Sequence, residues 1–177
     1  MKKLLTVLLV GLMLFGGAGA AFAQDLENGL GDQILDEENN LPGFRFDALK
    51  EFQDEIHKIN ELRIERLQLR IEVIENNDTI LDLYIEAREA GDKESLEAAM
   101  EVKQEIGPIN DEIRNLYNEV STERQAFNEE LKNKNIEAAK EHLDNIIDLL
   151  DSINDLTDSK IDLLEKIIDI LSVTEEV

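Results

Sequence analysis

The sequence contains no cysteine and no tryptophan, and only two prolines, among its 177 residues. Without cysteine the chain forms no disulfide and has no thiolate nucleophile, so its stability must come from buried apolar area. The shortage of proline and aromatic residues, beside an abundance of leucine, isoleucine, glutamate and aspartate, favours long helices over a sheet. The expected fold class is therefore all-α.

Basic residues are also scarce, with 18 lysines and arginines against 41 aspartates and glutamates and a net charge of −23. Phosphate contacts require clusters of lysine and arginine, so we expect no nucleic-acid partner. Diffusely bound cations and basic proteins suit this charge better. We expect the charge mainly to keep the protein soluble, because spaced surface carboxylates rarely form a specific cation site.

Residues 1–23 have the pattern of a secretory signal peptide. Lys2 and Lys3 precede a charge-free apolar stretch, and Ala21-Phe22-Ala23 provides an A-x-A exit. We expect cleavage before Gln24 and export to the periplasm, the cell envelope or the medium, without stable membrane insertion afterwards. An uncleaved membrane anchor is the alternative. Cleavage at this point leaves 16 basic and 41 acidic residues, a charge of −25.

The rest of the chain divides into a lead-in, one domain and a short tail. Residues 24–46 contain scattered acids, glycines and asparagines and predict a flexible acidic lead-in. Residues 47–172 predict a single helical domain of three segments, separated by Gly91-Asp92 and by a second turn at residues 133–135. Such short turns predict an antiparallel three-helix bundle with coiled-coil-like long helices, followed by a tail at residues 173–177.

Apolar residues recur at steps of three or four in the first two helices. In the first helix they are Leu49, Phe52, Ile56, Ile59, Leu67, Ile71, Ile74, Leu81 and Ile85. In the second they are Ala99, Val102, Ile106, Ile109, Ile113, Leu116, Val120 and Phe127. Each set predicts one buried stripe.

The third helix carries the clearest heptad pattern. Its a and d positions hold Leu143, Ile146, Leu150, Ile153, Leu164, Ile167 and Leu171, and the flanking positions are also apolar. So broad a face requires at least two covering helices, supplied by the bundle or by self-association.

The opposite face of the third helix carries a row of carboxylates, which we name the acidic ridge. Its members are Asp144, Asp148, Asp151, Asp155, Asp158, Asp162, Glu165 and Asp169. Like charges at this spacing oppose helix formation, so packing must outweigh their repulsion. We expect a solvated outer face, and the functional alternative is a surface for a basic partner.

All three helices contain polar or helix-breaking residues at one expected level, which we name the polar layer. Its members are Asn76, Asn77, Asp78, Gly107, Pro108, Thr157 and Lys160. Because proline lacks a backbone donor, we expect breaks near residues 76–78 and 107–108. The layer is then a local bend with mutually satisfied polar groups or, alternatively, a hinge that exposes apolar surface.

The sequence offers no recognisable catalytic or metal-binding motif. It has no glycine-rich phosphate loop, no EF-hand loop and no nucleophile elbow. Its two histidines, His57 and His142, lack the paired Glu-x-x-His spacing of di-iron bundles. We therefore expect no enzyme, no cofactor and no metal, and an enzyme hidden at the polar layer is the weakest alternative.

One short segment resembles a known family. Leu156-Thr157-Asp158-Ser159-Lys160 is similar to the L-T-x-x-Q element of exported helical chaperones of the Spy and CpxP class, with Lys160 where that family has glutamine. The similarity covers five residues and occurs once. It implies an all-helical protein without enzymatic activity that shields apolar segments of envelope proteins, whereas the strong negative charge departs from that class.

These observations favour an exported, non-enzymatic helical protein that acts by protein–protein binding. A chaperone-like role is one version of this hypothesis. The alternative is a structural spacer or a self-assembling coiled coil without a specific client. A weaker alternative is an acidic cation-binding surface protein.

Overall fold

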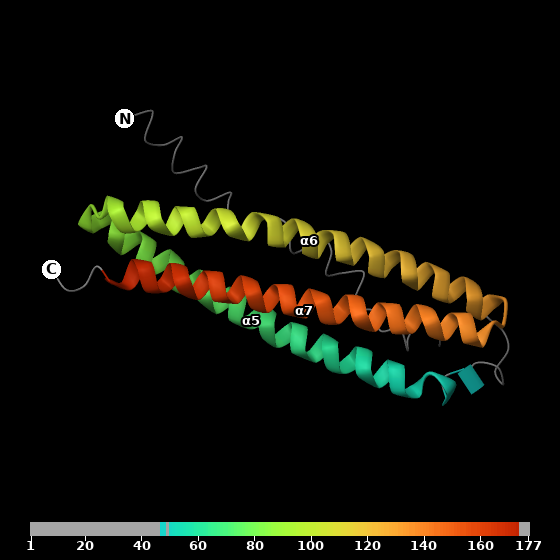
Figure 1. Ribbon diagram of the computed structural model, residues 1–177. Helices are drawn as coiled ribbons and strands as arrows, with labels where there is room; N and C mark the ends of the chain where they lie inside the picture. The colour runs from blue at the N-terminus through green and yellow to red at the C-terminus, as the bar shows by residue number, and fades with distance from the viewer. Residues whose placement is uncertain (1–46, 49, 174–177) are drawn as a thin grey trace, which may run out of the picture. The chain divides into compact units, whose positions relative to one another are not determined.

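The structure, a computed structural model, describes residues 47–48 and 50–173. In this part of the chain three long helices follow one another: α5 (Gln53–Ala90), α6 (Lys93–Lys132) and α7 (Ile136–Ser172) (Figure 1). The predicted all-α bundle of three antiparallel helices is confirmed. The predicted signal peptide, lead-in and tail lie outside the described residues, apart from Val173.

The two turns form where the sequence predicts them. Gly91 adopts a left-handed conformation with φ of 76°, which glycine reaches without a steric penalty, and ends α5. Asp92 then caps α6 by accepting a hydrogen bond from the Ser95 backbone N–H at 3.1 Å. A hydrogen bond from the Ser95 side chain and, less strongly, the bond from its backbone N–H hold the pKa of Asp92 below its ordinary value. Asn135 caps α7 in the same way, accepting from the Ala138 N–H at 3.5 Å.

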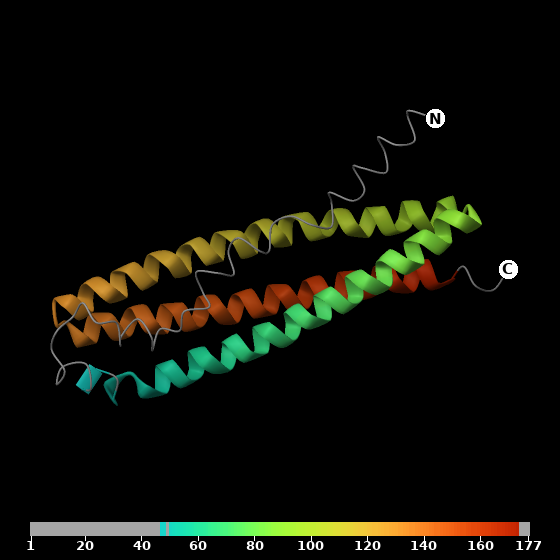
Figure 2. The same ribbon diagram turned by 180° about the vertical axis from the view of Figure 1, so that it is seen from behind.

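Helix α7 lies between the other two helices. It packs along both α5 and α6, whereas α5 and α6 contact each other little. Figures 1 and 2 show α6 and α7 running side by side while α5 crosses α7 from the other side. The broad apolar face of α7 is therefore covered by two helices of the same chain, as its width requires.

The core is built around α7. All seven apolar residues at its a and d positions are buried. From α6 the core takes Ala99, Val102, Ile106, Val120 and Phe127, and from α5 and the turn before it Phe52, Ile59, Leu62, Ile80 and Ala87. The rings of Phe52 and Phe127 meet edge to face with centroids 5.7 Å apart.

The expected helix breaks do not occur in α5. The helix is continuous through residues 76–78. The reason is local: the Asn77 side chain donates to the Val73 carbonyl oxygen at 2.6 Å, so it is satisfied within the helix instead of ending it.

Helix α6 is likewise continuous through Gly107 and Pro108. Both residues are exposed, so the proline ring lies away from α7, while Ile106 beside them is buried. Packing on the other face keeps the helix in one piece, and α6 follows a gentle bow in Figure 2.

The stripe predicted to be buried in the first helix is mostly exposed. Phe52 and Ile59 are buried, but Leu67, Ile71, Ile74, Leu81 and Ile85 are exposed. Helix α5 has two apolar faces, and α7 covers the one that contains Leu62, Ile80 and Ala87. A stripe shows that a face is apolar but does not show which face a neighbour covers, and this is why the prediction was wrong.

Candidate interaction surface

Six large apolar side chains of α5 form an exposed row on the face that α7 leaves uncovered. They are Ile64, Leu67, Ile71, Ile74, Leu81 and Ile85, each between 42% and 65% exposed. We name this row the outer seam. Its steps follow a heptad, with isoleucine at the a positions 64, 71 and 85 and Asp78 at the remaining a position. At 1.5 Å per residue the row is about 30 Å long.

The outer seam has an acidic edge and an edge that carries arginine. The e positions form the acidic edge and hold Glu61, Gln68, Glu75, Asp82 and Glu89, all exposed. The g positions form the arginine edge and hold Arg63, Arg70, Asn77 and Tyr84. Charged e and g positions beside an apolar a/d row are typical of a coiled-coil interface.

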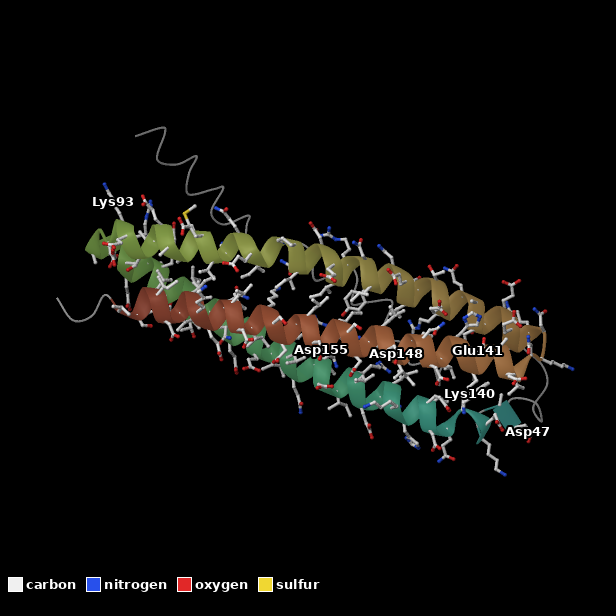
Figure 3. All side chains as sticks on the ribbon, viewed as in Figure 1. Asp47, Lys93, Lys140, Glu141, Asp148 and Asp155 are labelled. Carbon is white, nitrogen blue, oxygen red and sulfur yellow. The ribbon has the colours of Figure 1, made fainter. Side chains whose placement is uncertain are left out.

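All eight carboxylates of the acidic ridge are exposed on α7, and Figure 3 labels Asp148 and Asp155 among them. Among the described residues, no group of three or more histidines and carboxylates is placed to hold a metal ion. The role of the acidic ridge as a surface for a basic partner stays a prediction.

The polar layer is not a connected network. Of its α5 members, Asn76 has a buried Nδ2 without a partner and Asp78 is exposed. Gly107 and Pro108 of α6 face solvent. Among the described residues, no hydrogen bond or ion pair joins two members of the layer, so no shared site forms there.

The α7 members of the layer bond elsewhere. Thr157 is buried and its hydroxyl donates to the Ile153 carbonyl oxygen one turn earlier, at 2.7 Å. The Lys160 ammonium donates to the Asn110 Oδ1 at 3.0 Å, which links α7 to α6 just beyond Pro108. Burial lowers the pKa of Lys160. A hinge at Gly107-Pro108 stays a prediction.

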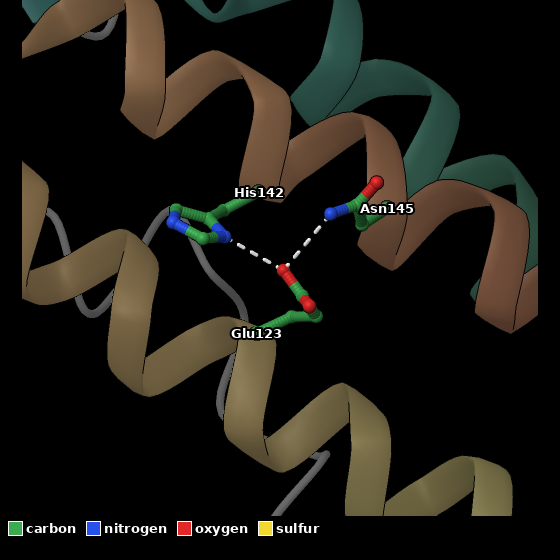
Figure 4. Close-up of polar contacts among 3 residues, drawn as sticks. All are labelled: Glu123, His142 and Asn145. Carbon is green, nitrogen blue, oxygen red and sulfur yellow. Dashed lines mark hydrogen bonds and ion pairs between the residues drawn. The ribbon is translucent and has the colours of Figure 1, made fainter.

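A carboxylate joins α6 to α7 near their shared turn (Figure 4). The Glu123 Oε2 lies 2.7 Å from the His142 Nδ1 and accepts a second hydrogen bond from the Asn145 Nδ2 at 3.1 Å. The bond to His142 and, less strongly, the bond from Asn145 lower the pKa of Glu123. Both partners hold the carboxylate in place, so the cluster acts as a link between helices.

Polar groups also join α5 to α7. The Lys140 Nζ lies 2.7 Å from the Glu55 carboxylate. Burial raises the pKa of Glu55, but the hydrogen bond from Lys140, a backbone hydrogen bond and the charge of Lys140 together outweigh burial, so the pKa is lowered. Asn154 is buried on α7, and its Nδ2 donates to the Leu62 carbonyl oxygen at 3.1 Å. These links fix the position of α5 along α7.

Arg66 is the most unusual member of the buried face of α5. Its guanidinium carbon lies 5.9 Å from the centre of the Tyr117 ring on α6, a cation–π contact, and its Nη1 is buried without a partner. Burial lowers its pKa. Sequence reasoning missed Arg66, although its spacing of seven from Ile59 and four from Leu62 places it on their face.

No protein-family model, no curated protein and no solved structure matches this chain. Among the helices that the structure describes, none is long and apolar enough to cross a membrane.

Proposed function

We propose that this protein is an exported, non-enzymatic helical protein that acts by binding protein through the outer seam of α5. The observation that supports the proposal is the seam itself, a row of large apolar side chains at heptad spacing that the bundle leaves exposed. Contiguous exposed apolar surface typically marks an interaction site, whereas a single exposed residue such as Met100 needs no explanation.

The size of the seam limits the kind of partner. Burying six half-exposed leucine and isoleucine side chains contributes roughly 5–9 kcal/mol, at about half the value of burying each one completely. Association itself costs about 4–15 kcal/mol. One seam therefore barely offsets the cost, and the partner must contribute apolar surface of its own. An apolar helix face satisfies this requirement, and a polar surface does not.

Export is the part of the proposal supported by residues 1–23. The mass of the native protein tests it: cleavage gives a chain that begins at Gln24. A native chain that retains Met1 and fractionates inside the cell contradicts export without affecting the proposal about the seam.

Site-directed photocrosslinking in the native compartment tests binding. A photoreactive residue replaces Ile71 in the seam or, as the matched position, Asp151 on α7. We expect a defined product at position 71 that is absent at position 151 and disappears with Leu67→Gln plus Ile74→Gln. Equal products at both positions contradict the proposal. A holding role toward apolar segments predicts many products at position 71, and a dedicated partner predicts one.

A further inference from the structure

The outer seam carries residue choices that specify how two helices pair. Isoleucine holds the a positions 64, 71 and 85, and leucine holds two of the three apolar d positions, 67 and 81, with isoleucine at the third, 74. A β-branched residue at a with leucine at d favours two parallel strands. From this pattern we infer that the outer seam of α5 binds the outer seam of a second copy of this chain, with the two helices parallel and in register. This inference rests on the proposed function and names its partner.

The two edges of the seam support the parallel orientation. In a parallel pair, each g residue faces the e residue five positions later on the other helix. Arg70 then faces Glu75 of the second copy, and the symmetry forms this ion pair twice. An antiparallel pair instead sets the acidic edge against the acidic edge of the second copy, which repels.

The same edges distinguish a second copy from a basic helix of another protein. A helix with lysine along both edges complements the acidic edge but repels Arg70 on the arginine edge. A second copy instead places its arginine edge beside the acidic edge and its acidic edge beside the arginine edge. The overall negative charge of two chains opposes their approach, but physiological salt screens exposed charges beyond about 8 Å.

Asp78 gives the pairing its register. In parallel, in-register helices it lies opposite Asp78 of the second copy, in the middle of an otherwise apolar seam. A single polar residue at an a position specifies register and oligomeric state while weakening the association. Two facing carboxylates repel, so this position lowers affinity and is where one substitution strengthens the dimer.

The surface is accessible for a second copy. Helix α7 packs against the opposite face of α5, which holds Leu62 and Ile80, and all six seam residues are exposed in the single chain. Two bundles can therefore pair through α5 without displacing any helix of either one.

Analytical ultracentrifugation of the protein as the cell exports it tests whether the dimer forms. Over about 1 to 200 µM and at physiological salt, we expect a monomer–dimer equilibrium. Leu67→Gln plus Ile74→Gln should weaken it by about 100-fold or more. The matched variant Met100→Gln, at an exposed apolar residue of α6, should leave it unchanged. A chain that stays monomeric, or a dimer unaffected by the seam variant, overturns the inference.

A single introduced cysteine tests the orientation, because the chain has none of its own. With Ile64→Cys the two thiols face each other in a parallel, in-register pair and form an intermolecular disulfide under mild oxidation. In an antiparallel pair they lie about 30 Å apart and do not. The variant Met100→Cys measures the background of random collision. No excess of linked dimer over this background overturns the parallel arrangement.

Charge variants test the register independently. Arg70→Glu and Glu75→Arg should each weaken the dimer by about tenfold, and their combination should restore it, whereas Asp78→Asn should strengthen it by about tenfold. Failure of restoration overturns the assigned contact.

If the chain is monomeric while photocrosslinking at position 71 captures a different protein through the seam, this inference fails and the proposed function stands. If nothing is captured, both fail.

Discussion

At the scale of single residues, Asn154 shows how a buried polar group can join two helices without being optimal. Its Nδ2 donates to the Leu62 carbonyl oxygen and to Glu65, but its Oδ1 is buried without a partner. An unpaired buried acceptor offsets most of what the two bonds contribute. The residue fixes the register of α5 against α7 more than it stabilises the fold.

We therefore expect Asn154→Leu to change the free energy of unfolding by less than about 1 kcal/mol, because it removes the unpaired oxygen together with the bonds. Asn154→Asp should cost about 2 kcal/mol or more, because it places a carboxylate against the Leu62 carbonyl oxygen and Glu65. Urea unfolding of the two variants measures both values. A loss from the leucine variant as large as from the aspartate variant contradicts this account.

Glu123 makes stability depend on pH in a defined direction. Its pKa is lowered in the folded chain, mainly by the bond to His142. Because its pKa is lowered in the folded chain, Glu123 contributes its full stabilisation above the ordinary carboxyl pKa. This stabilisation is lost as the pH falls through the pKa of the folded chain. The chain contains 41 acidic residues, so the wild-type curve alone cannot isolate the contribution of Glu123.

We expect the difference in unfolding free energy between wild type and Glu123→Gln to be constant from about pH 6 to pH 5 and to shrink below about pH 4. Urea unfolding at each pH gives this difference. Glu119→Gln, at an exposed position one turn earlier, provides the matched control substitution. If the difference in unfolding free energy for Glu123→Gln instead increases as the pH falls, the assigned sign is wrong.

At the scale of the helices, the two glycines differ in backbone conformation: Gly107 lies inside α6, whereas Gly91 is left-handed at the end of α5. A Cβ added at Gly107 meets nothing within 4 Å, and Gly91 has φ of 76°. Gly107→Ala together with Pro108→Ala should stabilise the fold by about 0.5 kcal/mol or more, because the double change also removes the ring that would crowd a Cβ at position 107, and Gly91→Ala should destabilise it by about 1 kcal/mol. Urea unfolding tests the opposite signs.

If Gly107-Pro108 is a hinge, Gly107→Ala with Pro108→Ala also reduces crosslinking at position 71. Unchanged crosslinking rules out the hinge.

The three helices were predictable from sequence to different degrees. The end of α5, both ends of α6 and the start of α7 followed from Gly91-Asp92 and the turn at residues 133–135, because capping and left-handed turn residues act locally. The buried face of α7 followed from its heptads, because one face was far more apolar than the other. In α5 both faces are apolar, and the buried one contains Arg66. Choosing between such faces depends on the neighbouring helix, which local periodicity does not describe.

The two faces of the bundle can be compared by one substitution in each. Ile153 of α7 is 0% exposed and Ile74 of α5 is 65% exposed. Ile153→Ala should cost about 2–5 kcal/mol and Ile74→Ala no more than about 0.5 kcal/mol in the monomer. Urea unfolding at a protein concentration below the dimerisation range measures both. A cost above about 2 kcal/mol for Ile74 contradicts its exposure in the single chain.

At the scale of the whole molecule, charge repulsion opposes folding in addition to the loss of conformational entropy. The chain carries 41 acidic residues against 18 basic ones, and the acidic ridge adds a continuous row of repelling neighbours along α7. The basic residues are too few to pair with all of these carboxylates in the way that Lys140 pairs with Glu55. Stability should therefore depend on ionic strength more than on any single contact.

We expect the melting temperature to rise smoothly by several degrees between about 10 mM and 500 mM NaCl, because the Debye length falls from about 30 Å to below 8 Å over this range. If the acidic ridge binds cations only diffusely, about 1 mM Ca²⁺ at constant ionic strength should shift the melting temperature no more than Mg²⁺ does, and by less than about 1 °C. Calorimetry in matched buffers separates the two effects. A saturable shift specific to Ca²⁺, removed by Asp151→Asn plus Asp155→Asn, would show instead that carboxylates spaced along one helix can form a cation site. A melting temperature independent of NaCl would show that repulsion along α7 is not the term that opposes its packing.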